Sequence, residues 1–197
     1  MIRWILLTAI YVAIFFWYTN FEAPLTRDEA DAYLAQIRER GTDPERLAAL
    51  TRFLYADDGD DFVMVNLIDM QQHDPAKGGE TPRQLLDRYM EYMWPSLLLR
   101  ACHPVFFSQG TFEALDIWGI DGAQKWSQFA LMRYRSRRDM LEISTNPQFK
   151  GSHDFKIAAM HKTVAFPVAG GFSYADPRWL LAGVFLVLGL LRRRRDG

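Results

Sequence analysis

The chain has 197 residues, of which 49% are hydrophobic and 14% aromatic, and its formal net charge is −1. This composition excludes a disordered chain and predicts one packed domain with short appendages. Five cations stand at the two ends, namely Arg3 and residues 192–195, which leaves the middle of the chain acidic. Nucleic-acid binding requires a basic surface that neutralises phosphates, so we expect no nucleic-acid partner.

An apolar segment at residues 2–21 opens the chain and predicts a transmembrane signal anchor. It holds about 20 residues, the length of helix that crosses ~30 Å of hydrocarbon. Trp4, Trp17 and Tyr18 would lie in the aromatic belts of the bilayer. A cleaved signal peptide is the alternative, although no Ala-x-Ala-like cleavage site follows the segment.

A second apolar segment, residues 179–191, precedes a basic tail at residues 192–197 and is predicted to be a C-terminal transmembrane helix. Thirteen residues of helix cover about 20 Å, so spanning requires that the flanking arginines snorkel and the bilayer thins. A buried helix or a surface anchor is one alternative. Another is a sorting tail that is cleaved near Gly170 and Gly171 and releases the domain.

The cations at both ends predict the orientation, because arginine is retained on the cytoplasmic side of a membrane. We therefore expect two spans of a bacterial inner membrane, with both termini cytoplasmic and the central domain periplasmic or otherwise extracytoplasmic. The lipid bilayer is then a partner of the chain.

Residues 22–58 are predicted to form a helical hairpin that packs on the main domain. Thr26 and Glu29 have the spacing of a capping box, and Pro44 stands where the first turn of a second helix tolerates proline. The acidic run at residues 57–61 does not match a calcium loop, because its glycine is third and no glutamate closes it. We interpret it as a solvated turn.

Strands and helices alternate through residues 59–168 in the order β-α-β-β-α-β. The expected strands are residues 62–68, 103–109, 126–135 and 161–167. Thr81 opens the first helix, Ser136 caps the second, which ends at about residue 145, and a short helix covers residues 153–160. This order is that of the ferredoxin-like or split βαβ fold, and residues 169–178 are expected to be a linker. The predicted class is thus α+β: a ferredoxin-like βαββαβ domain preceded by the helical hairpin and flanked by two transmembrane helices.

Several segments resemble the dimeric α+β barrel superfamily, most closely the small uncharacterised proteins near its EthD and NIPSNAP branches. They are Phe62-Val-Met-Val-Asn-Leu, the helix with Tyr92, the strand from His103-Pro104, and Leu131-Met-Arg-Tyr-Arg-Ser-Arg-Arg-Asp-Met-Leu141 with Pro147-Gln-Phe149 after it. The resemblance covers about residues 60–168 and implies a homodimer whose sheets pair face to face. Some members bind haem or oxidise small aromatic molecules, and many have no known activity. No haem-ligand motif matches here, so we expect no cofactor.

The single cysteine, Cys102, precedes His103, and one interpretation of such a pair is a catalytic thiolate and imidazole. Successive strand residues point to opposite faces, so we interpret Cys102 as a buried residue at a strand edge. A lone cysteine also excludes an internal disulfide. The four histidines lack the spacing of metal ligands, so no metal is expected, and a site shared by His103 and His161 is the alternative.

Arg133 and Asn66 are polar residues within otherwise apolar strands. A buried cation needs a partner, and an acid such as Asp69 or Glu142 is expected, with an anionic ligand held in the barrel as the alternative. A buried asparagine usually satisfies backbone groups, yet it can also orient a ligand. The candidate ligand-binding residues are Asn66, Tyr92, His103 and Arg133, and the catalytic residues are unknown.

These features together predict a membrane-anchored extracytoplasmic module that dimerises and binds a small-molecule ligand or a partner protein. The alternative is a small-molecule-modifying, monooxygenase-like enzyme, which rests on similarity of fold alone.

Overall fold

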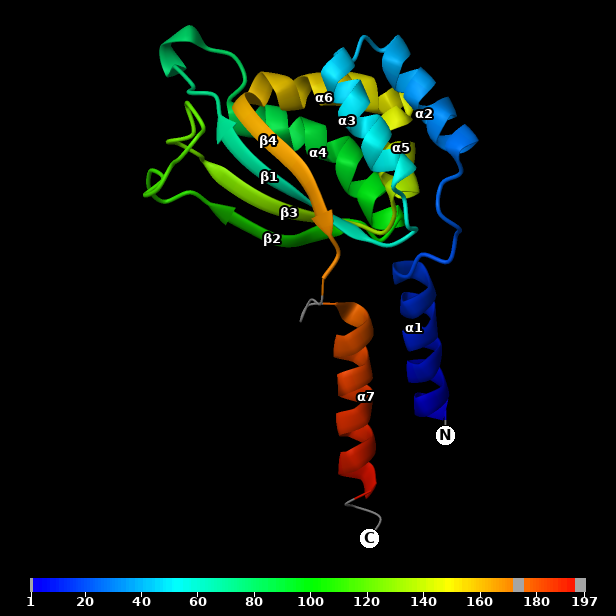
Figure 1. The fold of residues 1–197 in the computed structure, drawn as a ribbon. Helices are drawn as coiled ribbons and strands as arrows, with labels where there is room; N and C mark the ends of the chain where they lie inside the picture. Colours follow the sequence, from blue (N-terminus) through cyan, green and yellow to red (C-terminus); the bar gives the residue numbers. More distant parts are fainter. Residues whose placement is uncertain (1, 172–175, 194–197) are drawn as a thin grey trace. The chain divides into compact units, whose positions relative to one another are not determined.

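The computed structural model describes residues 2–171 and 176–193 and divides the chain into two compact units (Figure 1). One unit is Glu22–Gly170, and the other is Met1–Phe21 together with Gly171–Gly197. The first unit contains the sheet, and the second contains the two terminal helices.

The terminal helices are α1 (Ile2–Tyr18) and α7 (Pro177–Arg193), which pack together through aromatic side chains. The ring centroid of Phe185 lies 5.8 Å from that of Tyr11 and 6.4 Å from that of Trp4. Arg178 donates to the carboxylate of Asp176 at 2.6 Å, and its guanidinium lies 5.0 Å from the ring centroid of Tyr18.

Neither terminal helix is long and apolar enough to cross a bilayer, nor is any other helix in residues 2–171 and 176–193. The prediction of two transmembrane helices is therefore wrong. α1 ends at Tyr18 rather than at residue 21, which leaves 17 residues, or about 26 Å of helix. α7 also has 17 residues, but Pro177 and Arg178 at one end and arginines at the other restrict its apolar part to residues 179–191.

Several other predictions depended on these two transmembrane helices. The signal anchor at residues 2–21 and the inner-membrane localisation, with cytoplasmic termini and a periplasmic domain, are wrong, and a lipid bilayer partner has no support. The basic tail was predicted at residues 192–197, of which residues 194–197 lie outside the described residues.

The helical hairpin consists of α2 (Arg27–Glu39) and α3 (Pro44–Tyr55). The capping box is present, because the Thr26 hydroxyl accepts from the Glu29 N–H while the Glu29 carboxylate accepts from the Thr26 N–H. Leu34 and Leu54 are buried against Leu141 of α5, which confirms that the hairpin packs on the main domain.

Four strands and four helical segments make up the rest of the unit. In chain order they are β1 (Phe62–Met70), the 3-10 helix η1 (Pro75–Lys77), α4 (Pro82–Leu99), β2 (His103–Gln109), β3 (Gln128–Tyr134), α5 (Arg137–Thr145), α6 (Pro147–Ala159) and β4 (Met160–Ala169). All strand pairs are antiparallel, in the order β2-β3-β1-β4, so the predicted α+β domain of ferredoxin-like strand order is confirmed.

One helix is longer than expected. We predicted a short helix at residues 153–160, with Asn146 and Pro147 ending the preceding one. The preceding helix, α5, ends at Thr145 as predicted, but Asn146 also caps α6: its side chain accepts from the Gln148 N–H at 2.9 Å, and Pro147 occupies the first helical turn. Proline is tolerated there because the first N–H groups of a helix have no partner within the helix.

The register of β1 and β3 places alternate residues on two different faces of the sheet. Phe62 pairs with Tyr134 and Asn66 with Ala130, and this face is covered by α4, α5 and α6 (Figure 1). Met132 and Tyr134 pack there against a buried cluster that contains Tyr89, Met93, Leu97, Cys102 and Ile143. We call this side the helix-covered face. The residues in between, such as Val65 and Leu131, lie on the opposite side, which we call the outer face.

Candidate functional site

A cavity of about 640 Å³ lies between α4 and the helix-covered face of the sheet. Its walls are largely apolar and include Leu86, Met90 and Trp94 from α4, and Ile68 and Met132 from the sheet. Small-molecule sites in proteins are typically clefts of about 300–1,000 Å³ with apolar walls and a few polar groups. The cavity therefore has the size and the lining of a small-molecule site.

Two buried amides line this cavity. Asn66, 8% exposed, donates from Nδ2 to the carbonyl oxygens of Met64 at 3.0 Å and Ala130 at 3.4 Å. Gln128, also 8% exposed, has a side-chain oxygen Oε1 that accepts no hydrogen bond from the described residues. A buried acceptor without a donor costs about 1–3 kcal/mol. A ligand with a hydroxyl or N–H group would satisfy it.

Lys156 of α6 is the third polar group on the cavity wall. Its ammonium nitrogen lies 5.7 Å from the ring centroid of Tyr89, and it forms no ion pair within the described part of the chain. Burial lowers the pKa of Lys156, and the positive charge of Arg46 lowers this pKa further. The side chain is therefore a partly desolvated cation beside an apolar space.

The remaining charged residues on the wall stand on α4. Arg83 and Asp87 bind each other at 3.2 Å, and both are largely exposed. Glu91 also lines the cavity and is exposed to solvent. These groups therefore lie at the solvent side of the cavity.

Of the four residues predicted as a ligand site, Asn66 alone lines the cavity. Tyr92 packs against the core cluster, and its hydroxyl donates to the Ile143 carbonyl at 2.9 Å. His103 and Arg133 lie opposite each other on β2 and β3, at positions that alternate onto the outer face of the sheet. The structure does not bring the four together, and a ligand-binding role for any of them stays a prediction.

Arg133 is buried and paired, but not with the acid that we expected. Its Nε donates to Asp61 at 2.8 Å, and Nη1 donates to the Ala101 carbonyl at 3.0 Å. Asp61 directly precedes β1, so its distance from Arg133 is determined by the pairing of β1 with β3. Glu142 instead pairs with Arg100 at 2.9 Å. The expectation of an acidic partner for Arg133 is confirmed, but the acid is Asp61 and not Asp69 or Glu142.

Gln128 and Lys156 line the cavity but were not predicted from the sequence. Gln128 lies within the strand predicted at residues 126–135, an even number of residues from Met132 and Tyr134. That spacing is a signal that would place a polar side chain on the helix-covered face. Lys156 could not be assigned to the cavity, because its direction depends on how α6 packs against α4.

Cys102 is fully buried, as predicted. Its thiol donates to the Arg100 carbonyl at 3.4 Å, and burial raises its pKa to about 12. The thiol is therefore protonated at neutral pH, whereas nucleophilic catalysis requires the thiolate.

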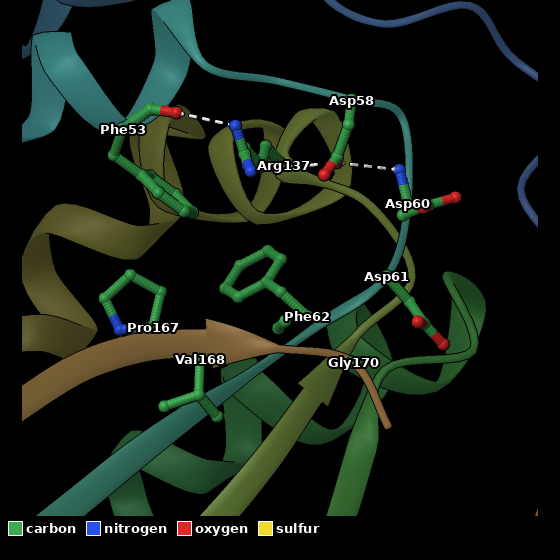
Figure 2. A pocket seen from close by; sticks show the side chains of 10 residues that line it. Phe53, Asp58, Asp60, Asp61, Phe62, Arg137, Pro167, Val168 and Gly170 are labelled. Atoms are coloured by element: carbon green, nitrogen blue, oxygen red, sulfur yellow. Dashed lines mark hydrogen bonds and ion pairs between the residues drawn. The ribbon is translucent and has the colours of Figure 1, made fainter. Parts of the chain in front are cut away.

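A second pocket, of about 460 Å³, lies between the acidic run and the end of β4 (Figure 2). Figure 2 shows that Arg137 extends from α5 toward Phe53 and Asp58. It donates to the Phe53 carbonyl at 2.8 Å, and its guanidinium lies 4.5 Å from the Phe53 ring centroid. The arginine therefore has a structural role here.

The interpretation of residues 57–61 as a solvated turn is wrong for its first residue. The Asp57 side chain is 3% exposed, accepts from the Leu25 N–H at 2.7 Å, and lies 3.5 Å from Nε of Arg137. Asp57 thus links the hairpin to α5 through its contacts with Leu25 and Arg137. Asp58, whose side chain is 62% exposed, fits the solvated description.

No family model matches this sequence, and no curated protein matches it. The fold is similar to that of a protein of unknown function from Rhodopseudomonas palustris, with 16% identity and a TM-score of 0.53. That similarity covers 67% of this chain and 96% of the other. The methylated form of the same protein has 18% identity and a TM-score of 0.54, over 68% and 95% of the two chains. At such identities the likeness shows the α+β fold alone.

Two further solved structures are more distant. A dimeric protein of unknown function and ferredoxin-like fold from Bacteroides fragilis has 8% identity and a TM-score of 0.36, over 58% of this chain and 99% of that one. SnoaB, a cofactor-independent oxygenase from Streptomyces nogalater, has 10% identity and a TM-score of 0.35, over 59% and 99%. Both TM-scores are below 0.5, so neither structure bears on the assembly or activity of this chain.

Proposed function

We propose that the ferredoxin-like unit is a binding module that holds an apolar small molecule in the cavity between α4 and the sheet. The observation that carries this proposal is the unsatisfied Oε1 of Gln128 on an otherwise apolar wall. An apolar ligand gains free energy by leaving water, at about 25 cal/mol per Å² of apolar surface buried. One hydroxyl on such a ligand would give the Gln128 oxygen its donor.

Titration with 1-decanol, a neutral apolar alcohol, tests the proposal by isothermal titration calorimetry. We expect saturable binding by the full chain and its loss in Met90→Trp, because a larger side chain on the cavity wall occupies the space. Leu99→Trp is the matched control, since Leu99 is the last residue of the same helix and is 72% exposed. Absence of binding to the unmodified chain, or equal binding by Met90→Trp, would overturn the proposal.

We also propose that the chain forms a homodimer through the outer face of its sheet. This face carries apolar side chains on all four strands, with Val65 on β1, Phe106 on β2, Leu131 on β3 and Phe166 on β4. Phe106 is 51% exposed and Phe166 is 44% exposed. Contiguous apolar surface of this kind is typical of an interface, and a second copy offers the same self-complementary surface about a two-fold axis.

A further inference from the structure

Lys156 differs from the other cation on the cavity wall. Arg83 has a carboxylate partner in Asp87, whereas Lys156 has none within the described residues. Lysine is seldom buried without an anion, because removing an ammonium group from water is costly. The lysine therefore needs either water or an anionic partner from outside the chain.

The topology places Lys156 near Gln128. Lys156 lies about one helical turn before Met160, and Met160 pairs with Met70 at the end of β1. Gln128 pairs with Ile68, two residues before Met70 on the same strand. Both polar groups thus belong to one end of the cavity.

The other end of the cavity is largely apolar. Met132 and Tyr134 are four and six residues beyond Gln128 on β3, and Leu97 faces them from the last turn of α4. A cavity that is polar at one end and apolar at the other suits an elongated molecule with a single polar head group.

Positive charges act on the side chains at the polar end. His153 lies one turn before Lys156 on α6, and its pKa is lowered first by burial and then by the charges of Lys156 and Arg46. Arg46 likewise lowers the pKa of Lys156, and Asp154, which is exposed, acts in the opposite direction on His153. An anion at this end would be attracted by Lys156 and Arg46 together.

We infer that Lys156 binds the carboxylate of an apolar acid whose hydrocarbon part occupies the cavity. This inference rests on the proposed small-molecule function and adds the chemical class of the ligand. A carboxylate would give the ammonium group a charge-assisted hydrogen bond, which is roughly twice as strong as a neutral one. The hydrocarbon chain would lie against the methionine and aromatic side chains of α4 and β3.

The test compares decanoate with 1-decanol, two probes of equal chain length, below their aggregation concentrations. Calorimetric titrations use the full chain, Lys156→Met and Lys156→Arg. We expect Lys156→Met to weaken decanoate binding by about 10- to 100-fold, the effect of a lost charge-assisted hydrogen bond. Its affinity for 1-decanol should change by less than about threefold, and Lys156→Arg should retain decanoate binding because the cation is kept.

The control for a general loss of positive charge is Lys162→Met, because Lys162 is half-buried, its ammonium nitrogen lies 4.8 Å from the Trp126 ring centroid, and neither residue lines the cavity. Equal decanoate binding by the unmodified chain and Lys156→Met, with 1-decanol still bound, would overturn the carboxylate assignment and leave the binding function intact. Failure of the unmodified chain to bind either probe would overturn both.

Discussion

Asn66 and Arg133 lie on the adjacent strands β1 and β3, yet they belong to opposite faces of the sheet. Asn66 pairs with Ala130, and Arg133 is three residues further along β3, an odd number that reverses the face. The amide therefore lines the cavity under α4, while the guanidinium binds Asp61 in the register of the outer face. The proposed ligand binding on the helix-covered face and the proposed dimerisation through the outer face therefore use different residues of the sheet.

Gln128→Met should stabilise the protein by about 1 kcal/mol, because it removes a buried acceptor that has no donor and keeps a side chain of similar volume. The same change should weaken 1-decanol binding, since the hydroxyl of the alcohol loses its acceptor. Urea unfolding followed by circular dichroism measures the stability. A decrease of more than about 1 kcal/mol in the free energy of unfolding would mean that Oε1 accepts a hydrogen bond within the protein.

Leu54→Ala should destabilise the protein by about 2–5 kcal/mol, the usual effect of removing a fully buried leucine side chain. Leu54 is 0% exposed and packs against Leu141, so the change tests whether the hairpin is part of the folded unit. Leu115→Ala, at a position that is 92% exposed, is the matched control and should alter stability by less than about 0.5 kcal/mol. Equal effects of the two substitutions would show that the hairpin does not pack as described.

The ion pair between Glu29 and Arg138 should give the stability a defined pH dependence. The Arg138 hydrogen bond, followed by those from Thr26, lowers the pKa of Glu29 from 4.5 to about 2. Because the pKa is lower in the folded state, the stabilisation is complete above about pH 4.5 and is lost as the pH falls toward 2.

Melting temperatures of the unmodified chain and of Glu29→Gln measure this effect. The difference between them should be largest at neutral pH and should vanish near pH 2. A difference that stays constant from pH 7 to pH 2 would show that the carboxylate charge of Glu29 contributes nothing.

Phe166→Glu should convert the dimer into a monomer, because two copies of the charge would be buried in the apolar contact of the outer faces. Size-exclusion chromatography with light scattering reports the mass directly. Leu99→Glu at the end of α4 is the control and should leave the mass unchanged. A monomeric unmodified chain, or a dimeric Phe166→Glu, would refute dimerisation through this face.

Local signals in the sequence predicted the ferredoxin-like part of the fold. Thr81 and Ser136 cap helices in the structure as predicted, and each of the four strands begins within about two residues of its predicted start. These signals act over a few residues, so no tertiary information is needed to recognise them.

The errors concern quantities that local patterns do not determine. The apolar character of residues 2–21 indicated a transmembrane helix, but the helix ends at Tyr18 and is therefore too short to cross a bilayer. The partner of Arg133 depends on which strands are neighbours, and the pairing of β1 with β3 brings Asp61 there. The cavity depends on how α4 packs over the sheet, which no spacing of residues in one strand specifies.

The methionine methyl groups report most directly on the proposed cavity. Met90, Met93, Met132 and Met160 line it, whereas Met140 packs with the helical hairpin. We predict that adding 1-decanol to protein labelled with ¹³C at the methionine methyl groups shifts the NMR signals of the four cavity methionines and leaves that of Met140 in place. Unchanged signals from the four, or a shift confined to Met140, would contradict the assignment of this cavity as the ligand site.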